Sequence, residues 1–326
     1  MNMGLLQAAF YKPPQASSEE LALPTQVREQ KHQINTRHCE KYHNLVAWNS
    51  GIASVIHPNY LQVLTLPMQL SMMVNKPFPF KPMGLVHLAN EIKVNELPEQ
   101  NAELNLKTSF AGLQVHKRGY VFALKSEGFV DDALAIEATS FYLARVKHDF
   151  ALDEQSGHIA SNPDTTQLLP SLNNNDHQEP SLSFPLTFEQ GIGRRYASAS
   201  GDYNPIHLSR WSAKLLGFRR AIAHGMYSKA ICISMLAKNN AFDCRTASPS
   251  IFADKAITTQ FVQPIYLPSA TEMEVSQAIP KSDEIQGNEM QGNETQGNET
   301  PRLRFSLKSQ QRAKTRLHIL GEVSTI

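Results

Sequence analysis

The sequence predicts an α+β fold built from two successive units, each a buried helix followed by a meander of antiparallel strands. An apolar helical segment at residues 59–74 precedes four strand-like runs, and helical segments at residues 188–200, 206–216 and 225–237 precede four more. A polar stretch at residues 149–182 separates the two groups. The halves share too little residue identity to establish a repeat, so this prediction depends on the order of the elements.

The first unit is predicted from the spacing of its apolar residues. Residues 59–74 are apolar nearly all round, which is typical of a helix buried on several sides. Pro67 lies inside this segment and is expected to kink the helix or to end its first part, because proline lacks the N–H that continues a helix. The strand-like runs that follow, several of which alternate apolar and polar residues, cover residues 84–94, 102–115, 119–129 and 133–147.

The second unit ends in four further strand-like runs, at residues 257–267, 270–278, 301–310 and 315–324. Residues 286–300 contain a five-residue unit beginning QGNE three times, and with Met290 as their only large apolar side chain they cannot offset ordering entropy by burial. We expect a flexible loop that joins two strands, with a partner-binding segment as the alternative. The predicted boundaries are residues 1–148 for the first unit, 149–182 for an exposed connector and 183–326 for the second unit.

The composition is that of an ordinary globular protein. Hydrophobic residues make up 41% and charged residues 19%, and 31 basic against 30 acidic residues leave no net field that would attract nucleic acid or an anionic membrane. Cys39, Cys232 and Cys244 lack the spacing of a disulfide framework or a zinc site. The sequence shows neither a secretory signal nor an apolar run long enough to span a membrane, so a soluble, cytoplasmic protein is expected.

The stretch YASASGDYNPIH, which ends at His207, concentrates ionisable groups around a turn. Gly201 permits a sharp turn, and Pro205 favours the first position of a helix, so His207 falls in the first helical turn. Asp202 and His207 are then expected to face one small space, where two titratable groups can handle a water molecule. Asn204 can orient either side chain or a ligand oxygen. The alternative is a plain capping turn, since Asp, Asn and Pro are common at helix starts.

A second histidine follows in the stretch AIAHGM. Gly225 is predicted to open another helix, where its backbone N–H could be presented to an oxyanion. His224, directly before it, is expected to have a structural role at the helix start rather than a catalytic one. A helix cap does not require His207, and this favours an acid–base site over a capping turn alone.

The string SGDYNPIH, followed after 16 residues by HGM, resembles the signature of the MaoC-like acyl dehydratases, the (R)-specific or type-2 enoyl-CoA hydratases. The stretch FVQP at residues 261–264 is similar to the F-x-x-P with which this family begins a long strand. The similarity is strong from Tyr196 to Pro264 and elsewhere concerns the order of strands. It implies a hot-dog fold, in which a long antiparallel sheet wraps a central helix, and here two such units that form a pseudo-dimer.

The resemblance also implies roles for the residues of the motif. Asp202 and His207 would be the catalytic acid–base pair, Gly225 the amide donor to the thioester oxygen, and Asn204 a supporting polar contact. No metal and no redox cofactor is implied.

The chain departs from the family at two places. Some members carry a serine eight residues after the Gly of HGM, where this chain has Ile233 followed by Ser234. His207 is therefore expected to be oriented by a different partner. A Gly-Asp pair that often follows F-x-x-P is replaced by Pro268-Ser269.

Two-copy members of the family keep the catalytic string in one unit, while the other unit widens a tunnel for longer acyl chains. The first half of this chain lacks the string, and its nearest echo, His57-Pro58-Asn59, is expected to be a helix start. The Met- and Phe-rich run at residues 66–80 could line such a tunnel, because methionine adapts to varied apolar ligands. Plain core is the interpretation that we favour for this run.

The reaction that the resemblance implies is the reversible hydration of trans-2-enoyl-CoA to (R)-3-hydroxyacyl-CoA. Two alternatives are a dehydratase acting on 3-hydroxyacyl chains attached to acyl carrier protein and a non-catalytic module that binds acyl thioesters. Lys214, Arg219 and Arg220 lie near the site in sequence and could hold the phosphates of coenzyme A, although solvated surface charge is the favoured role for each. A monomer, with the two units paired within one chain, and a homodimer both agree with the sequence.

Overall fold

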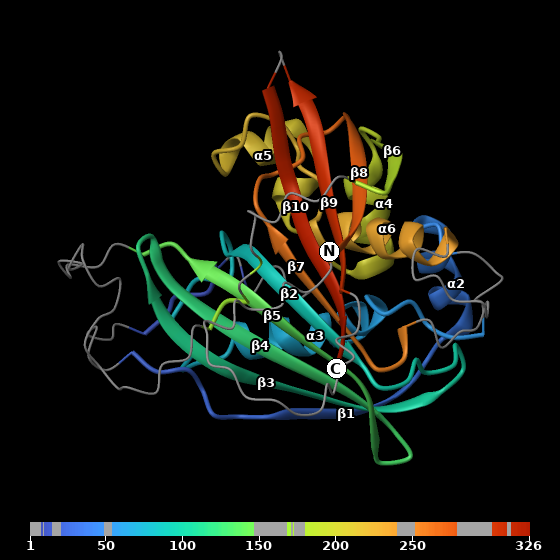
Figure 1. The fold of residues 1–326 in the computed structure, drawn as a ribbon. Coiled ribbons are helices and arrows are strands. Elements are labelled where there is room, and N and C mark those ends of the chain that lie inside the picture. Colours follow the sequence, from blue (N-terminus) through green and yellow to red (C-terminus); the bar gives the residue numbers. More distant parts are fainter. Residues whose placement is uncertain are drawn as a thin grey trace, which may run out of the picture.

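The computed structural model describes residues 21–48, 54–146, 180–239, 252–278, 302–311 and 314–326, together with residues 8, 10–14, 168–170 and 172. These residues form one ten-stranded antiparallel sheet (Figure 1). The first half of the chain supplies β1 (Arg28–Gln33), β2 (Val86–Val94), β3 (Glu103–His116), β4 (Gly119–Val130) and β5 (Ala133–Ala144). The second half supplies β6 (Leu182–Phe188), β7 (Lys255–Phe261), β8 (Ser269–Ala278), β9 (Arg302–Gln311) and β10 (Lys314–Thr325).

The order of the strands shows that the two halves repeat one arrangement. The sheet runs β1-β3-β4-β5-β2-β7-β10-β9-β8-β6. From one edge inward, the first half has the order β1, β3, β4, β5, β2. From the other edge inward, the second half has the corresponding order β6, β8, β9, β10, β7. The halves join where β2 pairs with β7, with Ile92 opposite Ile257.

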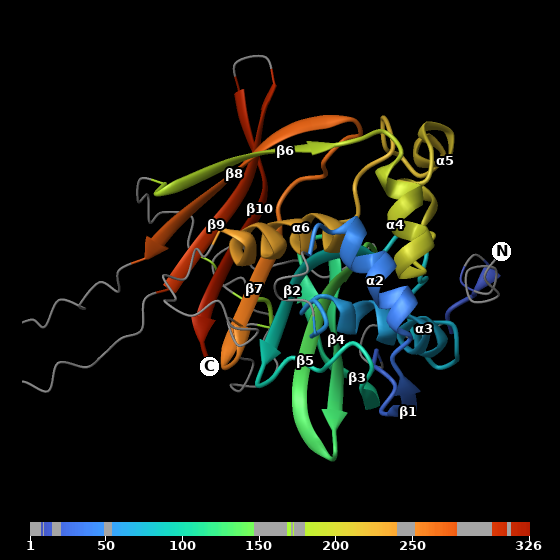
Figure 2. The same ribbon diagram turned by 90° about the vertical axis from the view of Figure 1, so that its right-hand side faces the viewer.

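Each half wraps its strands around one buried helix, α3 (Tyr60–Met73) in the first and α6 (Gly225–Lys238) in the second. The fold is therefore a double hot-dog. Figure 2 shows α2 (Thr36–Leu45) and α4 (Ile192–Ser200) beside the two central helices.

Residues at the start of α3 form hydrogen bonds between the two halves. Nε2 of His57 donates to the carbonyl oxygen of Ala230 at 3.1 Å, and Nδ2 of Asn59 donates to that of Met226 at 2.8 Å. Both acceptors belong to α6. His57-Pro58-Asn59 is thus a helix start, as predicted, and also a contact between the central helices.

The seam between the halves also holds a fully buried lysine. Lys229 on α6 donates to the backbone carbonyls of Asn90 at 3.2 Å and Ile257 at 3.1 Å, and to the side-chain oxygen of Asn90. Burial lowers the pKa of this ammonium group well below its ordinary value. The three bonds tie α6 to β2 and β7, and so they help to fix the helix that begins at Gly225.

The structure confirms the predicted helices at residues 59–74, 188–200 and 225–237 and contains a strand for each predicted run. It adds β1, α2 and β6, of which β1 and β6 are largely exposed edge strands. The helix expected at residues 206–216 is instead a 3-10 turn (Pro205–His207) followed by α5 (Arg210–Leu215). Ser209 caps α5 by accepting the N–H of Ser212, which explains the break.

The helix α3 continues through Pro67, so of the two alternatives for this proline the one that ends the helix is excluded. One further expectation was wrong. Phe261 ends β7 instead of beginning a strand, and the chain then leaves the sheet through Pro264.

Some predictions fall on residues outside the described ranges: the QGNE repeat, most of the connector, and Cys244. The repeat does lie in sequence between β8 and β9, which are paired neighbours. Cys39 and Cys232 are buried free thiols, and burial raises the pKa of each to about 12. No helix in the described part of the chain is long and apolar enough to cross a membrane. The unit boundaries remain a prediction.

Candidate active site

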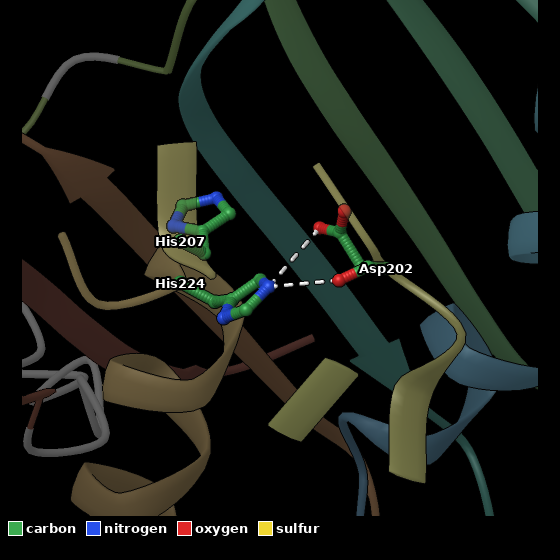
Figure 3. A group of neighbouring side chains, drawn as sticks. All are labelled: Asp202, His207 and His224. Carbon is green, nitrogen blue, oxygen red and sulfur yellow. Dashed lines mark hydrogen bonds and ion pairs between the residues drawn. The ribbon is translucent and has the colours of Figure 1, made fainter. Parts of the chain in front are cut away.

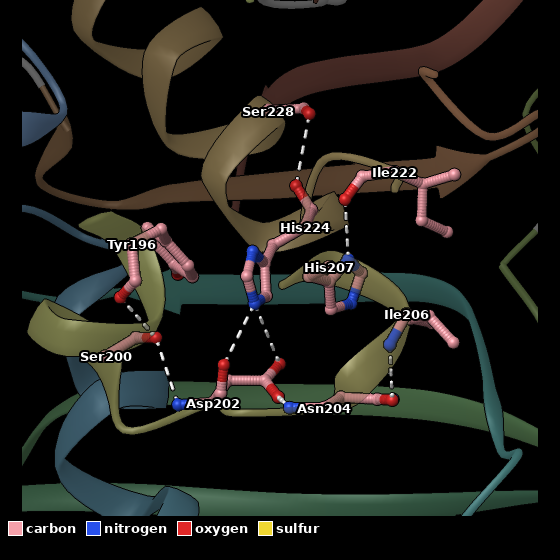
Figure 4. A network of polar contacts seen from close by, with 9 residues as sticks. All are labelled: Tyr196, Ser200, Asp202, Asn204, Ile206, His207, Ile222, His224 and Ser228. Carbon is pink, nitrogen blue, oxygen red and sulfur yellow. Dashed lines mark hydrogen bonds and ion pairs between the residues drawn. The ribbon is translucent and has the colours of Figure 1, made fainter. Parts of the chain in front are cut away.

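The turn that carries the motif begins where α4 ends. Gly201 adopts the left-handed conformation (φ 78°), and its N–H bonds to the carbonyl oxygen of Ala197 at 2.9 Å. Oδ1 of Asp202 then accepts the N–H of Asn204 at 3.1 Å, and Oδ1 of Asn204 accepts the N–H of Ile206 at 3.4 Å (Figure 4). The stretch is therefore a capping turn, and the capping bonds hold the Asp202 carboxylate in place.

The helix α4 packs directly against this turn. A Cβ atom added to Gly193 would lie 1.9 Å from the backbone oxygen of His207 and 3.0 Å from its carbonyl carbon. Only glycine permits such an approach. The position of His207 therefore depends on a backbone contact with α4.

His207 is buried, and its tautomer follows from its hydrogen bond. Nδ1 lies 2.8 Å from the carbonyl oxygen of Ile222. Because a carbonyl oxygen only accepts, Nδ1 carries the hydrogen, and Nε2 keeps a free lone pair. The expectation that His207 has a partner other than the serine of some family members is confirmed. Ile233, at the position of that serine, is fully buried in the core, and the carbonyl oxygen of Ile222 orients the imidazole.

His224 lies closer to Asp202 than the sequence suggested. Its Nε2 lies 3.0 Å from the backbone oxygen of Asp202 and 3.9 Å from Oδ2 (Figure 3). The rings of His207 and His224 stack with their centroids 3.7 Å apart. His224 is the N-cap residue of α6, as a structural role requires, but it also forms one wall of the site.

Asp202, His207 and His224 form the one group within the described residues that could offer three ligands to a metal ion, with one ligand atom from each within 4.8 Å of the others. The bonding pattern fits a metal poorly. Nε2 of His224 must donate to the Asp202 carbonyl, so its lone pair is on Nδ1, which is buried and has no hydrogen-bond partner among the described residues. The three groups therefore do not point lone pairs at one centre.

Burial and neighbouring groups together set the protonation states of these side chains. Burial lowers the pKa of His207 below its ordinary value, although Asp202 and the Ile222 carbonyl act to raise it. Burial and the neighbouring His207 lower the pKa of His224 to about 3. Burial alone would raise the pKa of Asp202, but His224, His207 and the N–H of Asn204 bring it below its ordinary value. Near neutral pH the site holds one carboxylate beside two neutral imidazoles.

A cavity of about 470 Å³ adjoins these groups, and both halves of the chain line it. The four predicted site residues, Asp202, Asn204, His207 and Gly225, all contribute to its wall. The side chain of Asp202 is 39% exposed, whereas that of His224 is 2% exposed. Gly225 is the first residue of α6, and N–H groups in a first helical turn have no acceptor within the helix. The structure thus brings the four residues to one space.

The first half supplies polar side chains that the sequence did not indicate. Gln62, His87 and Tyr142 line the cavity. The ring of His87 lies 4.5 Å from that of Tyr142 and 4.9 Å from that of Phe261, measured between centroids. These residues come from one helix and two strands, and no local motif distinguishes them in the sequence.

The Met- and Phe-rich run of the first half divides between core and cavity. Leu66, Leu70 and Met73 line the cavity, whereas Phe78 and Phe80 are buried in an apolar cluster. Both interpretations of this run therefore apply to part of it.

Comparisons with known proteins agree with this fold. Residues 173–298 match the family model of the MaoC like domain. Over these residues this chain is similar to MaoC-like domains. Its curated relatives include 3-hydroxyacyl-thioester dehydratase X of Mycobacterium tuberculosis, 26% identical over 219 residues, which are 67% of this chain and 69% of the relative. Peroxisomal enoyl-CoA hydratase 2 of Arabidopsis thaliana is 26% identical over 164 residues, 49% of this chain and 52% of the relative.

Solved structures resemble this chain over nearly its whole length. HtdX of Mycobacterium tuberculosis has a TM-score of 0.64 at 20% identity, with 92% of this chain and 100% of HtdX covered. A MaoC-like dehydratase of Phytophthora capsici has a TM-score of 0.65 at 15% identity, with 93% and 96% covered. A double-hotdog protein of Mycobacterium tuberculosis has a TM-score of 0.54 at 10% identity, with 94% and 97% covered. These likenesses agree with the double hot-dog fold.

Proposed function

We propose that this MaoC-like protein is a hydro-lyase that reversibly hydrates a trans-2-enoyl thioester, such as enoyl-CoA, to the (R)-3-hydroxyacyl thioester. The observation that carries the proposal is that a carboxylate oxygen of Asp202 and a ring nitrogen of His207 lie within 4.8 Å of each other at the cavity wall. Two hydrogen bonds to a single water molecule can bridge groups at this separation. Gly225, in the first turn of α6, lines the same cavity, and its N–H would be the donor there.

Asp202 and His207 would act together on that water. Each can accept a hydrogen bond, Asp202 as an ionised carboxylate and His207 through Nε2. As the water oxygen adds to C3, one of them takes its proton, and the charge that moves to the thioester oxygen is stabilised by the N–H of Gly225 near the helix N-terminus. The group that took this proton then delivers a proton to C2 and so returns to its starting state. One water is added across the double bond, and dehydration uses the same groups in reverse.

The names of the relatives support this reaction class. One is named for the dehydration of 3-hydroxyacyl thioesters and the other for the hydration of enoyl-CoA, which are the two directions of one reaction. The (R) configuration and the roles of Asp202 and His207 are part of the proposal. A non-catalytic module that binds acyl thioesters is the weaker candidate, because a binder has no need of a carboxylate and an imidazole arranged around a water site.

The proposal is tested by following the ultraviolet absorbance of crotonyl-CoA and of a longer enoyl-CoA, which falls as the conjugated double bond is hydrated. Chiral analysis of the product gives the configuration at C3. We expect the absorbance to fall with time and the product to be the (R)-3-hydroxyacyl thioester. If thioesters on coenzyme A and on acyl carrier protein are both left intact, the binding module becomes the better account.

The acid side of the pH profile depends on His207. Its pKa is lowered from the ordinary value of 6.5, and the neutral form is the one that accepts a proton from water. The kcat/KM for hydration should therefore be constant above pH 6.5 until other groups titrate and should fall at a lower pH as His207 becomes charged. A plot of log kcat/KM against pH checks this expectation. An acid limb centred above pH 7 would contradict the assignment.

A further inference from the structure

The rim of the cavity carries an exposed apolar surface that the proposed chemistry does not use. Trp211 and Leu215 lie four residues apart on α5, and they are 75% and 88% exposed. Residues at this spacing share one side of a helix. Leu216, directly after α5, is 41% exposed and lines the cavity. The apolar surface of α5 therefore continues into the cavity rim.

The same surface is strongly basic. The chain has no Asp or Glu from Tyr203 to Asn239. Nζ of Lys214 lies 5.6 Å from the ring centroid of Trp211, and the guanidinium groups of Arg219 and Arg220 lie near the ring of Tyr266. We call the following exposed residues the α5 face: Arg210, Trp211, Lys214, Leu215, Leu216, Arg219 and Arg220.

Two further cations line the cavity from the first half of the chain. Arg118, in the turn between β3 and β4, and Arg145, directly after β5, are exposed and line the cavity. Asp202 is the only acidic residue among the described residues that line the cavity. A molecule that approaches the cavity therefore meets cations from both halves of the chain.

The α5 face is rigidly connected to the turn that carries His207. Oγ of Ser212 donates to the carbonyl oxygen of Pro205 at 2.7 Å, and Ala213 is fully buried. A molecule held on this face would thus be held at a fixed position relative to the water site.

From these observations we infer that the α5 face docks an acidic acyl carrier protein, which delivers its thioester-linked acyl chain into the cavity. The inference deepens the proposed function and depends on it, because it names the partner that presents the substrate. Acidic side chains of the carrier would pair with the cations, and its apolar residues would cover Trp211 and Leu215. Complementary charge raises the rate of encounter, and the aromatic anchor supplies most of the affinity.

Other occupants fit the α5 face less well. The nucleotide of coenzyme A could use the cations for its phosphates, but phosphate contacts alone do not account for the exposed side chains of Trp211 and Leu215. A second copy of this chain, related by a twofold axis, would bring the same cations against one another. A lipid surface fits less well because the apolar side chains that would enter it lie on α5, which has only six residues.

The experiment compares one enoyl chain on three carriers: an acidic bacterial acyl carrier protein, coenzyme A and N-acetylcysteamine. The variants are Trp211→Ala, Leu215→Ser and Lys214→Glu. Arg219 and Arg220 are not replaced, because they directly precede the segment whose Ile222 carbonyl holds His207. Arg28→Glu is the matched control, since Arg28 is an exposed cation on the edge strand β1 of the other half. For the carrier-protein substrate we expect each test variant to raise KM about tenfold with little change in kcat.

The expected pattern has two further parts. Hydration of the coenzyme A and N-acetylcysteamine thioesters is unchanged in all variants, and Lys214→Glu reduces the salt dependence of kcat/KM for the carrier-protein substrate. Equal losses with coenzyme A and carrier protein would assign the face to the nucleotide and overturn the inference. The inference is also overturned if the wild-type protein hydrates the small thioesters but not the carrier-bound chain. It is likewise overturned if Trp211→Ala abolishes self-association or vesicle binding and leaves turnover of the carrier-bound chain unchanged. In those cases turnover of the small thioesters still supports the proposed function.

Discussion

Replacing Asp202 with Asn is expected to lower kcat for hydration by about 10²- to 10⁴-fold without unfolding the protein. The retained side-chain oxygen can still accept the N–H of Asn204, so the turn keeps its shape. The variant lacks the negative charge that would attract the proton of the bound water. His207→Asn should have a comparable effect, because its amide N–H can replace the bond of Nδ1 to Ile222 but nothing replaces Nε2.

The rates are measured with an enoyl thioester by its ultraviolet absorbance, and the fold is checked by thermal melting. Asp131→Asn is the control, since Asp131 is an exposed residue of the turn between β4 and β5 with φ 46°, a conformation that Asn also tolerates. If both groups act on one water, the double variant should be little slower than either single variant. Full activity in either single variant would refute the assignment of that residue.

Gly193→Ala is expected to lower both stability and activity, although residue 193 does not line the cavity. The new Cβ would lie 1.9 Å from the backbone oxygen of His207, so α4 and the 3-10 turn must move apart. Overpacking of this kind costs about 1–3 kcal/mol of unfolding free energy. A displacement of about 1 Å in a catalytic group can lower the rate about 10²-fold. Thermal melting and steady-state kinetics measure the two effects.

Gly191→Ala provides the matched control on the same helix. A Cβ there meets nothing within 4 Å, and Gly191 has φ −86°, which any residue can adopt. This variant should keep wild-type turnover. If Gly193→Ala were as stable and as active as Gly191→Ala, the close contact between α4 and the turn would not determine the position of His207.

The sequence predicted the parts of the fold that follow from local pattern. Alternating apolar residues located the eight central strands, and the apolar segment at residues 59–74 located α3, because both patterns reflect burial. The strands β1 and β6 were missed because they are edge strands with few buried side chains. The break between the 3-10 turn and α5 depends on the side chain of Ser209, and this local effect overrides the helical pattern.

The site likewise has residues that a local motif predicts and residues that only the folded chain brings together. Asp202, Asn204 and His207 lie within six consecutive residues, so their convergence follows from one turn, and Gly225 follows from a helix start. His87 and Tyr142 reach the cavity only because β2 pairs with β7 of the second half and β5 pairs with β2, which no local pattern encodes. His224 could have been recognised as part of the site, since it directly precedes Gly225. Its contact with the backbone of Asp202, however, is formed across the fold.

The most direct measurement is a crystal structure of the protein with a saturated acyl thioester, which cannot be hydrated. The account predicts one water molecule within hydrogen-bond distance of both the Asp202 carboxylate and Nε2 of His207, facing the carbon that corresponds to C3. It also predicts the thioester oxygen at the N–H of Gly225. An acyl chain bound away from this cavity, or Asp202 and His207 without a shared water, would contradict it.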